Sequence, residues 1–128
     1  MDVLRSPYHQ FIPNKMDHER TLLIVDDEVD VCMWLRRALL KHFRKVECAH
    51  TLTEGYALAA IFQPDVVLLD NNLPDGYGLE HIAEFKISSK PARVVMLSAM
   101  DIRQEAMDAG ADEFIGKPVD VQALKAIA

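Results

Sequence analysis

Residues 21–28 read TLLIVDDE, a short apolar run that ends in three acidic residues. An uninterrupted apolar run of this length is typical of a β-strand that is buried on both faces. The runs VVLLD at residues 66–70 and RVVML at residues 93–97 repeat the pattern. Shorter strands are predicted at residues 46–49 and 113–115, so the sequence predicts five strands in all.

Amphipathic helices are predicted between these strands, because apolar residues recur there at helical spacing. Thr51 and Glu54 form a capping box that opens one of the helices. The predicted helices span about residues 29–43, 51–62, 79–87, 102–109 and 119–127. Strands that are apolar on both faces need a layer of helices on each side. The sequence therefore predicts an α/β fold of three layers around a doubly wound, five-stranded parallel sheet.

The composition is that of one globular domain, with 128 residues, 50% hydrophobic residues and a formal net charge of −6. The acidic surplus argues against binding of nucleic acid or an anionic membrane by this domain, because both require a basic surface. Residues 1–20 show no periodicity and no signal-peptide pattern, so we expect a flexible lead-in before a domain at residues 21–128. No apolar run reaches membrane-spanning length, and Cys32 and Cys48 are expected to be reduced thiols. A cytoplasmic protein is predicted.

Polar residues stand where the chain leaves each predicted strand. Asp26 and Asp27 follow the first strand, Asp70 ends the third, Ser98 follows the fourth and Lys117 the fifth. In a parallel sheet such positions converge at one edge, where ligands bind. Carboxylates that meet there repel one another unless a cation is present, and their oxygens suit Mg²⁺ or Mn²⁺. Together with a lysine and a hydroxyl group, this set favours phosphoryl transfer to a carboxylate nucleophile.

Four stretches, IVDDE, VVLLDNNLPDGYGLE, VVMLSA and GADEFIGKP, resemble the receiver domain of two-component response regulators. The resemblance covers about residues 21–127 and implies a flavodoxin-like receiver fold with strand order 2-1-3-4-5. It implies that Asp70 is the phosphoacceptor. It also implies that Asp26, Asp27, Asp70 and the backbone carbonyl of Asn72 hold the metal, with Asp27 as a direct ligand.

The resemblance also implies roles in signalling. Lys117 matches the lysine that pairs with the phosphoryl group, Ser98 matches the hydroxyl residue that contacts this group on activation, and Phe114 matches the aromatic switch residue. A sensor histidine kinase or a histidine phosphotransfer protein would be the donor. The face formed by the fourth helix, fifth strand and fifth helix would bind an effector or a second copy. Such a domain is a switch with weak self-phosphorylation and autophosphatase activity, not a turnover enzyme.

Two further pairs of residues have proposed roles. Asn72 and Met100 stand where the family tunes dephosphorylation. Met100 cannot orient a water molecule by hydrogen bonding, so we expect a long-lived phosphorylated state. Arg36 and Arg37 belong to a positive patch on the first helix. This patch is either a solvated helix face or a docking site for the phosphodonor.

Other functions are weighed against the receiver. An aspartyl-nucleophile phosphatase usually carries a second acid two residues after the nucleophile, where this chain has Asn72. The full acidic set with Lys117 disfavours a pseudo-receiver scaffold. A flavodoxin-like cofactor binder would need a phosphate-binding loop where Asp26 and Asp27 repel phosphate. The last helix, residues 119–127, is short for a receiver, which fits either a single-domain regulator or a piece of a longer chain.

Overall fold

The computed structural model describes residues 19–88, 90–120 and 122–128. The predicted lead-in at residues 1–20 lies almost entirely outside this part of the chain. The flexible lead-in and the domain boundary at residue 21 therefore stay predictions.

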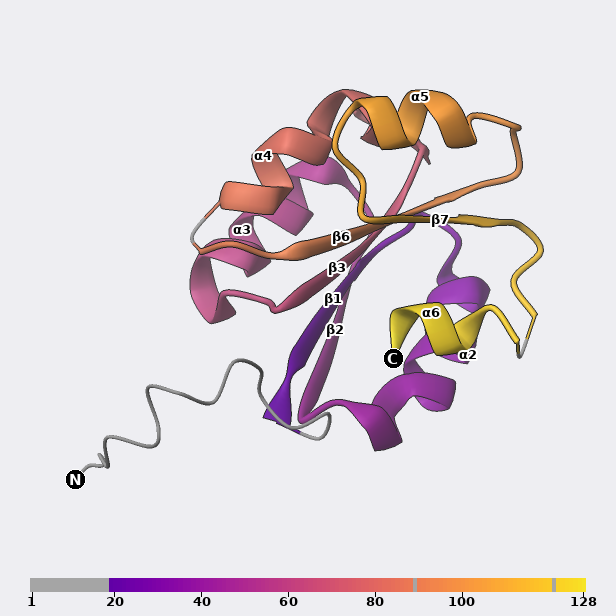
Figure 1. The fold of residues 1–128 in the computed structure, drawn as a ribbon. Coiled ribbons are helices and arrows are strands. Elements are labelled where there is room, and N and C mark those ends of the chain that lie inside the picture. The colour runs from indigo at the N-terminus through magenta and orange to yellow at the C-terminus, as the bar shows by residue number, and fades with distance from the viewer. Residues whose placement is uncertain (1–18, 89, 121) are drawn as a thin grey trace, which may run out of the picture.

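Five strands form one parallel sheet at the centre of the molecule (Figure 1). They are β1 (Thr21–Val25), β2 (Lys45–Ala49), β3 (Val66–Asp70), β6 (Arg93–Ser98) and β7 (Glu113–Gly116). Their order is β2-β1-β3-β6-β7, and every neighbouring pair is parallel. The predicted sheet and its strand order are therefore confirmed.

The two apolar strands at the centre of the sheet are buried along their whole length, as their sequences predicted. Successive side chains of a strand point to opposite faces of the sheet. Leu23 and Val25 of β1 accordingly join the core on one face, and Leu22 and Ile24 join the core on the other. The continuous apolar runs thus supply two hydrophobic cores at once.

Helices cover both faces of the sheet (Figure 1). One face carries α2 (Val29–Leu39) and α6 (Leu124–Ile127), and the other carries α3 (Leu52–Phe62), α4 (Ile82–Ile87) and α5 (Arg103–Asp108). Two 3₁₀ segments, η2 (Leu40–His42) and η3 (Gly78–His81), stand after α2 and before α4. The predicted three-layer arrangement is confirmed, although the first predicted helix is α-helical only to Leu39.

Thr51 caps α3 as predicted, but the return bond of the capping box goes to the residue before Thr51 and not to Thr51 itself. Thr51 Oγ1 accepts a hydrogen bond from Glu54 N at 3.0 Å, and Glu54 Oε1 accepts one from His50 N at 2.7 Å. At the other end, Gln63 adopts a left-handed conformation with φ of 52° directly before Pro64. Because proline cannot continue a helix, these two residues end α3 where the sequence predicted.

The segment after β3 contains a short antiparallel hairpin. Its strands are β4 (Asn72–Leu73) and β5 (Gly76–Tyr77). Asp75 in the turn accepts hydrogen bonds from Leu52 N at 2.8 Å and from Thr53 N at 3.0 Å. The hairpin is therefore tied to the first turn of α3, where free backbone N–H groups need acceptors.

The prediction of a last helix over residues 119–127 is wrong in its first half, because α6 begins only at Leu124. Asp120 Oδ1 accepts a hydrogen bond from Ala123 N at 2.8 Å. A local bond from an aspartate side chain to the backbone favours a turn over a regular helix.

Candidate functional site

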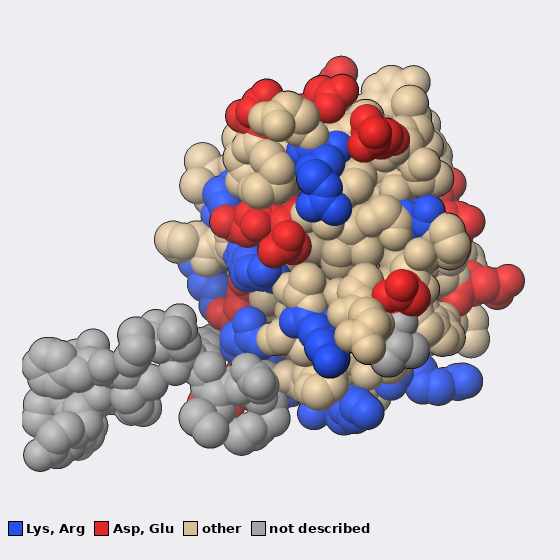
Figure 2. Space-filling model, turned by 45° about the vertical axis from the view of Figure 1, so that its right-hand side comes forward, with Lys and Arg blue, Asp and Glu red and all other residues tan. Residues whose placement is uncertain are grey.

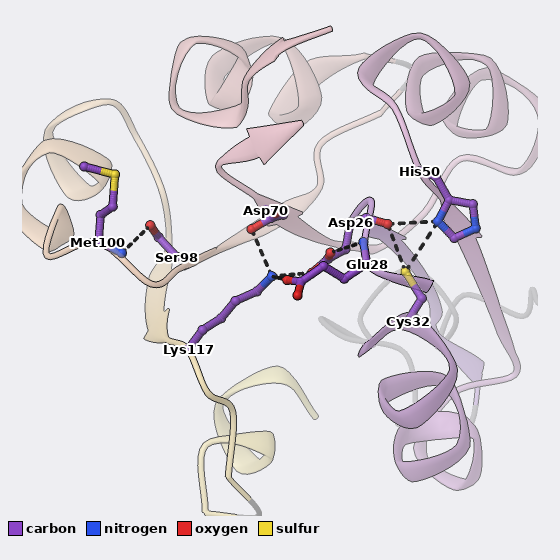
Figure 3. Close-up of polar contacts among 8 residues, drawn as sticks. All are labelled: Asp26, Glu28, Cys32, His50, Asp70, Ser98, Met100 and Lys117. Carbon is purple, nitrogen blue, oxygen red and sulfur yellow. Dashed lines mark hydrogen bonds and ion pairs between the residues drawn. The ribbon is translucent and has the colours of Figure 1, made fainter. Parts of the chain in front are cut away.

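Three of the predicted site residues meet at the carboxyl end of the sheet (Figure 3). Lys117 Nζ lies 2.8 Å from Asp26 Oδ2 and 3.2 Å from Asp70 Oδ1. Asp26 is fully buried, and Asp70 is 4% exposed. Each residue follows or ends a different strand, so the parallel sheet brings them together although they are far apart in the sequence.

Asp27 completes an acidic cluster at this edge. One carboxylate oxygen from each of Asp26, Asp27 and Asp70 lies within 4.8 Å of the other two, and the Asp27 side chain is exposed to solvent. Asp26 Oδ2 is buried and lies 2.8 Å from the Lys117 ammonium. An oxygen-only cluster with such a carboxylate atom fits a hard divalent cation.

Asn72 lies at the start of β4, two residues beyond Asp70, and its side chain is exposed. It pairs with Tyr77 across the hairpin. A role for its backbone carbonyl as a metal ligand stays a prediction.

The electrostatics of the site keep one carboxyl group close to protonation. Burial, followed by the negative charges of Asp26 and Asp27, raises the pKa of Asp70 from 3.8 to about 6, although Lys117 opposes this rise. Burial alone would lower the pKa of Lys117, but hydrogen bonds to Asp26 and Glu28 outweigh it and raise that pKa. Lys117 therefore stays charged, and Asp70 is mostly ionised at neutral pH.

Glu28 belongs to the site but was not among the predicted site residues. Its Oε1 lies 2.6 Å from Lys117 Nζ, and its backbone N–H donates to Asp26 Oδ1 at 2.8 Å. Glu28 also precedes the first turn of α2. Glu28 could have been considered from the sequence because it is the third acidic residue of IVDDE. Its contact with Lys117, which lies near the other end of the chain, could not be predicted from local sequence.

Asn71 and Gly78, which follow the acceptor position in the sequence, were also not predicted as site residues. Asn71 is buried, its N–H donates to Leu97 O at 3.1 Å, and its Oδ1 accepts from Leu79 N at 3.0 Å. Gly78 passes so close to the acceptor that a Cβ there would lie 2.1 Å from the Asp70 carbonyl oxygen. Because glycine has no Cβ, Gly78 permits this close approach of two backbones.

The family model for the response regulator receiver domain matches residues 22–128. The chain belongs to this family. The receiver function predicted from the sequence is therefore confirmed: it is a receiver domain of two-component response regulators, a class of signalling switch.

Several curated response regulators are similar to this receiver domain. KdpE, the KDP operon transcriptional regulatory protein of Escherichia coli, is 39% identical over 108 residues, which cover 82% of this chain and 48% of KdpE. MprA of Mycobacterium avium is 33% identical over 82% of this chain and 47% of MprA. The chain spans about half the length of these relatives.

Solved structures agree with this assignment. A response regulator from Burkholderia pseudomallei, described with a phosphorylated aspartic acid, calcium ion and citrate, superimposes with a TM-score of 0.76 at 26% identity and covers 85% of this chain and 66% of that chain. A CheY-like receiver domain from Methanospirillum hungatei gives a TM-score of 0.75 at 27% identity, covering 84% of this chain and 88% of that chain. Of the helices in the described ranges, none combines the length and apolar character needed to cross a lipid bilayer.

The two predicted switch residues of the receiver lie on β6 and β7. Ser98 is buried, and its Oγ accepts a hydrogen bond from Met100 N at 3.0 Å (Figure 3). Phe114 is 7% exposed, and the Arg103 guanidinium carbon lies 5.0 Å from the centre of its ring. The Ser98 hydroxyl is thus bonded to the following loop, and the Phe114 ring is packed inward beneath α5.

The structure does not bring Arg36 and Arg37 to the acidic cluster. Both lie in the last turn of α2, where Arg36 Nε donates to Val46 O at 3.1 Å. Basic side chains also gather along the lower edge of the face in Figure 2. Beside Lys117 there is a groove of about 460 Å³, which lies between Trp34 of α2 and the chain that follows β7.

Proposed function

We propose that Asp70 is the phosphoacceptor of this receiver domain. The observation that supports this most strongly is its placement: a nearly buried carboxylate 3.2 Å from Lys117 and within 4.8 Å of the Asp26 and Asp27 carboxylates. One oxygen of Asp70 forms the new P–O bond, while the bond from phosphorus to the donor nitrogen breaks and its electron pair leaves with the donor.

The charges around Asp70 match this role. A carboxylate must be ionised to attack, and a pKa raised to about 6 leaves Asp70 mainly ionised at neutral pH. Lys117 neutralises the arriving phosphoryl oxygens once these replace part of its present contact with the carboxylates. The exposed carboxylate of Glu28 lies 2.6 Å from the Lys117 ammonium. This ion pair positions Lys117 before the donor arrives.

Asp26, Asp27, Asp70 and the Asn72 carbonyl would hold Mg²⁺ or Mn²⁺. A cation bound there supplies positive charge to the phosphoryl oxygens and relieves the repulsion between the carboxylates. The Burkholderia pseudomallei regulator, whose description names both a phosphorylated aspartic acid and a calcium ion, supports this assignment.

The phosphorylated state would be read through Ser98 and Phe114. Ser98 Oγ has a free O–H donor for a phosphoryl oxygen while it still accepts from Met100 N, so movement of Ser98 toward the phosphoryl group would draw the loop after β6 toward the site. That movement changes the packing around Phe114, and the face of α5, β7 and α6 is the element that binds an effector or a second copy.

The donor, a sensor histidine kinase or a histidine phosphotransfer protein, would dock along α2. The groove between Trp34 and Val119 leads to Lys117, and Trp34 is 43% exposed, so the donor histidine can approach Asp70 from there. Arg36 and Arg37 lie farther along the same helix and would contact acidic residues of the donor.

The central test is labelling with acetyl phosphate and Mg²⁺. We expect wild type to be phosphorylated and Asp70→Asn to be inert, because the amide is not a nucleophile. Asp108→Asn, a change to an exposed acid on α5, is the matched control and should be labelled like wild type. Equal labelling of Asp70→Asn and wild type would refute the proposal.

Charge reversal on α2 tests the docking surface. Arg37→Glu should slow transfer from the cognate kinase about tenfold and leave labelling by acetyl phosphate unchanged. Arg36→Glu is the less clean variant because it also removes the bond to Val46 O. Equal losses with the kinase and with acetyl phosphate would contradict docking at this helix.

The lifetime of the phosphorylated state tests the tuning residues. Met100 is 55% exposed beside Ser98, and an apolar side chain there cannot orient an attacking water molecule. Met100→Glu should therefore accelerate phosphate release about tenfold. The decay of the labelled protein after removal of acetyl phosphate measures this rate, and an unchanged decay would show that Met100 has no tuning role.

A further inference from the structure

The Cys32 thiol and the His50 imidazole lie behind Asp26, on the side away from Lys117 (Figure 3). Cys32 Sγ donates to Asp26 O at 3.1 Å, and His50 Nδ1 lies 2.9 Å from the same carbonyl oxygen. Because a carbonyl only accepts, the His50 Nδ1 carries the proton in this contact. The proposed phosphoryl chemistry uses neither of these side chains.

The second thiol, Cys48 of β2, is the immediate neighbour of the first. Cys48 Sγ lies 3.8 Å from Cys32 O, so the Cys48 side chain contacts the residue that carries the first thiol. Both cysteines are free thiols in the structure, and they are the only two cysteines of the chain. A disulfide within these 128 residues can therefore join only this pair.

The two thiols differ in the way that a redox pair requires. Cys32 is 1% exposed, whereas Cys48 is only partly buried and lies on β2, an edge strand of the sheet. Cys48 is thus the more accessible thiol and meets the oxidant first, and Cys32 is the protected second thiol.

We propose that Cys32 and Cys48 form a reversible redox site that closes to a disulfide between α2 and β2. The oxidant is a small-molecule disulfide such as oxidised glutathione. The Cys48 thiolate attacks one glutathione sulfur and releases the other glutathione as a thiol. Cys32 then attacks the Cys48 sulfur of the mixed disulfide, loses its proton and releases the second glutathione.

Closure of the disulfide slows phosphorylation of Asp70, a consequence that rests on the proposed function. The Cys32 S–H no longer exists to donate to Asp26 O. Cys32 also lies in the first turn of α2, where its N–H donates to Glu28 O at 3.0 Å. Drawing this turn toward β2 moves Glu28, whose own N–H holds Asp26 Oδ1.

The test treats the full chain with oxidised glutathione and then with dithiothreitol, and follows the intact mass. We expect a product lighter than the reduced protein by the mass of two hydrogens, loss of both thiols together in a maleimide count, and reversal by dithiothreitol. Cys32→Ser should stop at the mixed disulfide on Cys48. Cys48→Ser, which alters a partly exposed side chain and should fold, should give no bridged product.

Stable glutathione adducts on the wild-type chain, disulfide-linked dimers, or independent loss of the two thiols would overturn the proposal. Asp70→Asn should form the disulfide as readily as wild type, so a failure of the phosphoacceptor assignment leaves this test intact. The oxidised wild type should be labelled by acetyl phosphate at least about threefold more slowly than the reduced protein. Equal labelling rates would overturn the coupling to Asp70.

Discussion

The two ends of the sheet both carry aspartates, but the aspartates are satisfied differently. At the amino end, Asp65 accepts a hydrogen bond from Thr21 N at 2.8 Å with one oxygen and pairs with Lys90 Nζ at 2.8 Å with the other. At the carboxyl end, Asp70 shares Lys117 with Asp26. Each carboxylate at the amino end thus has its own partners, whereas those at the carboxyl end compete for one cation.

The pKa values follow the same division. At the amino end, the hydrogen bonds from Lys86 and Val94 N outweigh burial and lower the pKa of Asp112. At the carboxyl end, burial and Asp26 raise the pKa of Asp70 to about 6. A carboxylate with its own donors stabilises the fold, and a crowded carboxylate holds unfavourable energy that a ligand can relieve. The amino end therefore stabilises the fold, and the carboxyl end carries the proposed phosphoacceptor site.

The largest expected effect comes from crowding the carboxyl end further. A Cβ at Gly78 would lie 2.1 Å from the Asp70 carbonyl oxygen, so Gly78→Ala must displace one of the two backbones. We expect a loss of about 3 kcal/mol in the free energy of unfolding by urea, together with slower labelling. Gly116→Ala is the matched control because its Cβ meets nothing closer than 4.0 Å. Similar stabilities of the two variants would contradict the close approach.

The second prediction concerns the contribution of Asp70 to the free energy of unfolding and how that contribution depends on pH. The pKa of Asp70 is raised from 3.8 to about 6 by folding. Between these two pH values the Asp70 carboxyl group is therefore protonated in the folded protein but ionised in the unfolded chain. Stability from this group is present below pH 4 and is lost as pH rises through 6. Asp70→Asn should therefore exceed wild type in unfolding free energy by up to about 3 kcal/mol above pH 6, and by little near pH 4.

Urea unfolding of both proteins between pH 4 and 7, without divalent cations, measures this difference. Added Mg²⁺ should reduce it by stabilising wild type alone. Curves that run parallel over the whole range would show that Asp70 is not strained in the folded state.

The smallest effect tests the amino end. Asp65→Ala leaves the buried Thr21 N–H without its acceptor and Lys90 without its partner. We expect a loss of about 2 kcal/mol in unfolding free energy, with acetyl phosphate labelling of Asp70 unchanged. Asp65→Ala should thus lower the free energy of unfolding, whereas Asp70→Asn should raise it. Slower labelling of Asp65→Ala would contradict the proposal that the two ends of the sheet have separate roles.

The sequence by itself determined the sheet and the place of the site. The apolar runs at residues 21–25 and 66–70 can only be buried on both faces, which requires two helix layers and puts Asp26 and Asp70 at one edge. The helix over residues 119–127 was the weakest prediction, because the side chain of Asp120 replaces helix bonds that periodicity alone implies.

Only the tertiary structure decided how the charges are shared. The contacts of Lys117 with Glu28, of Asp75 with the first turn of α3, and of Cys48 with Cys32 all join segments that are distant in sequence. Local spacing reports the face on which a residue lies but not which distant partner reaches it. The raised pKa of Asp70 depends on its burial and on those partners, so the crowded carboxylate could be located from the sequence, but its energetic state could not.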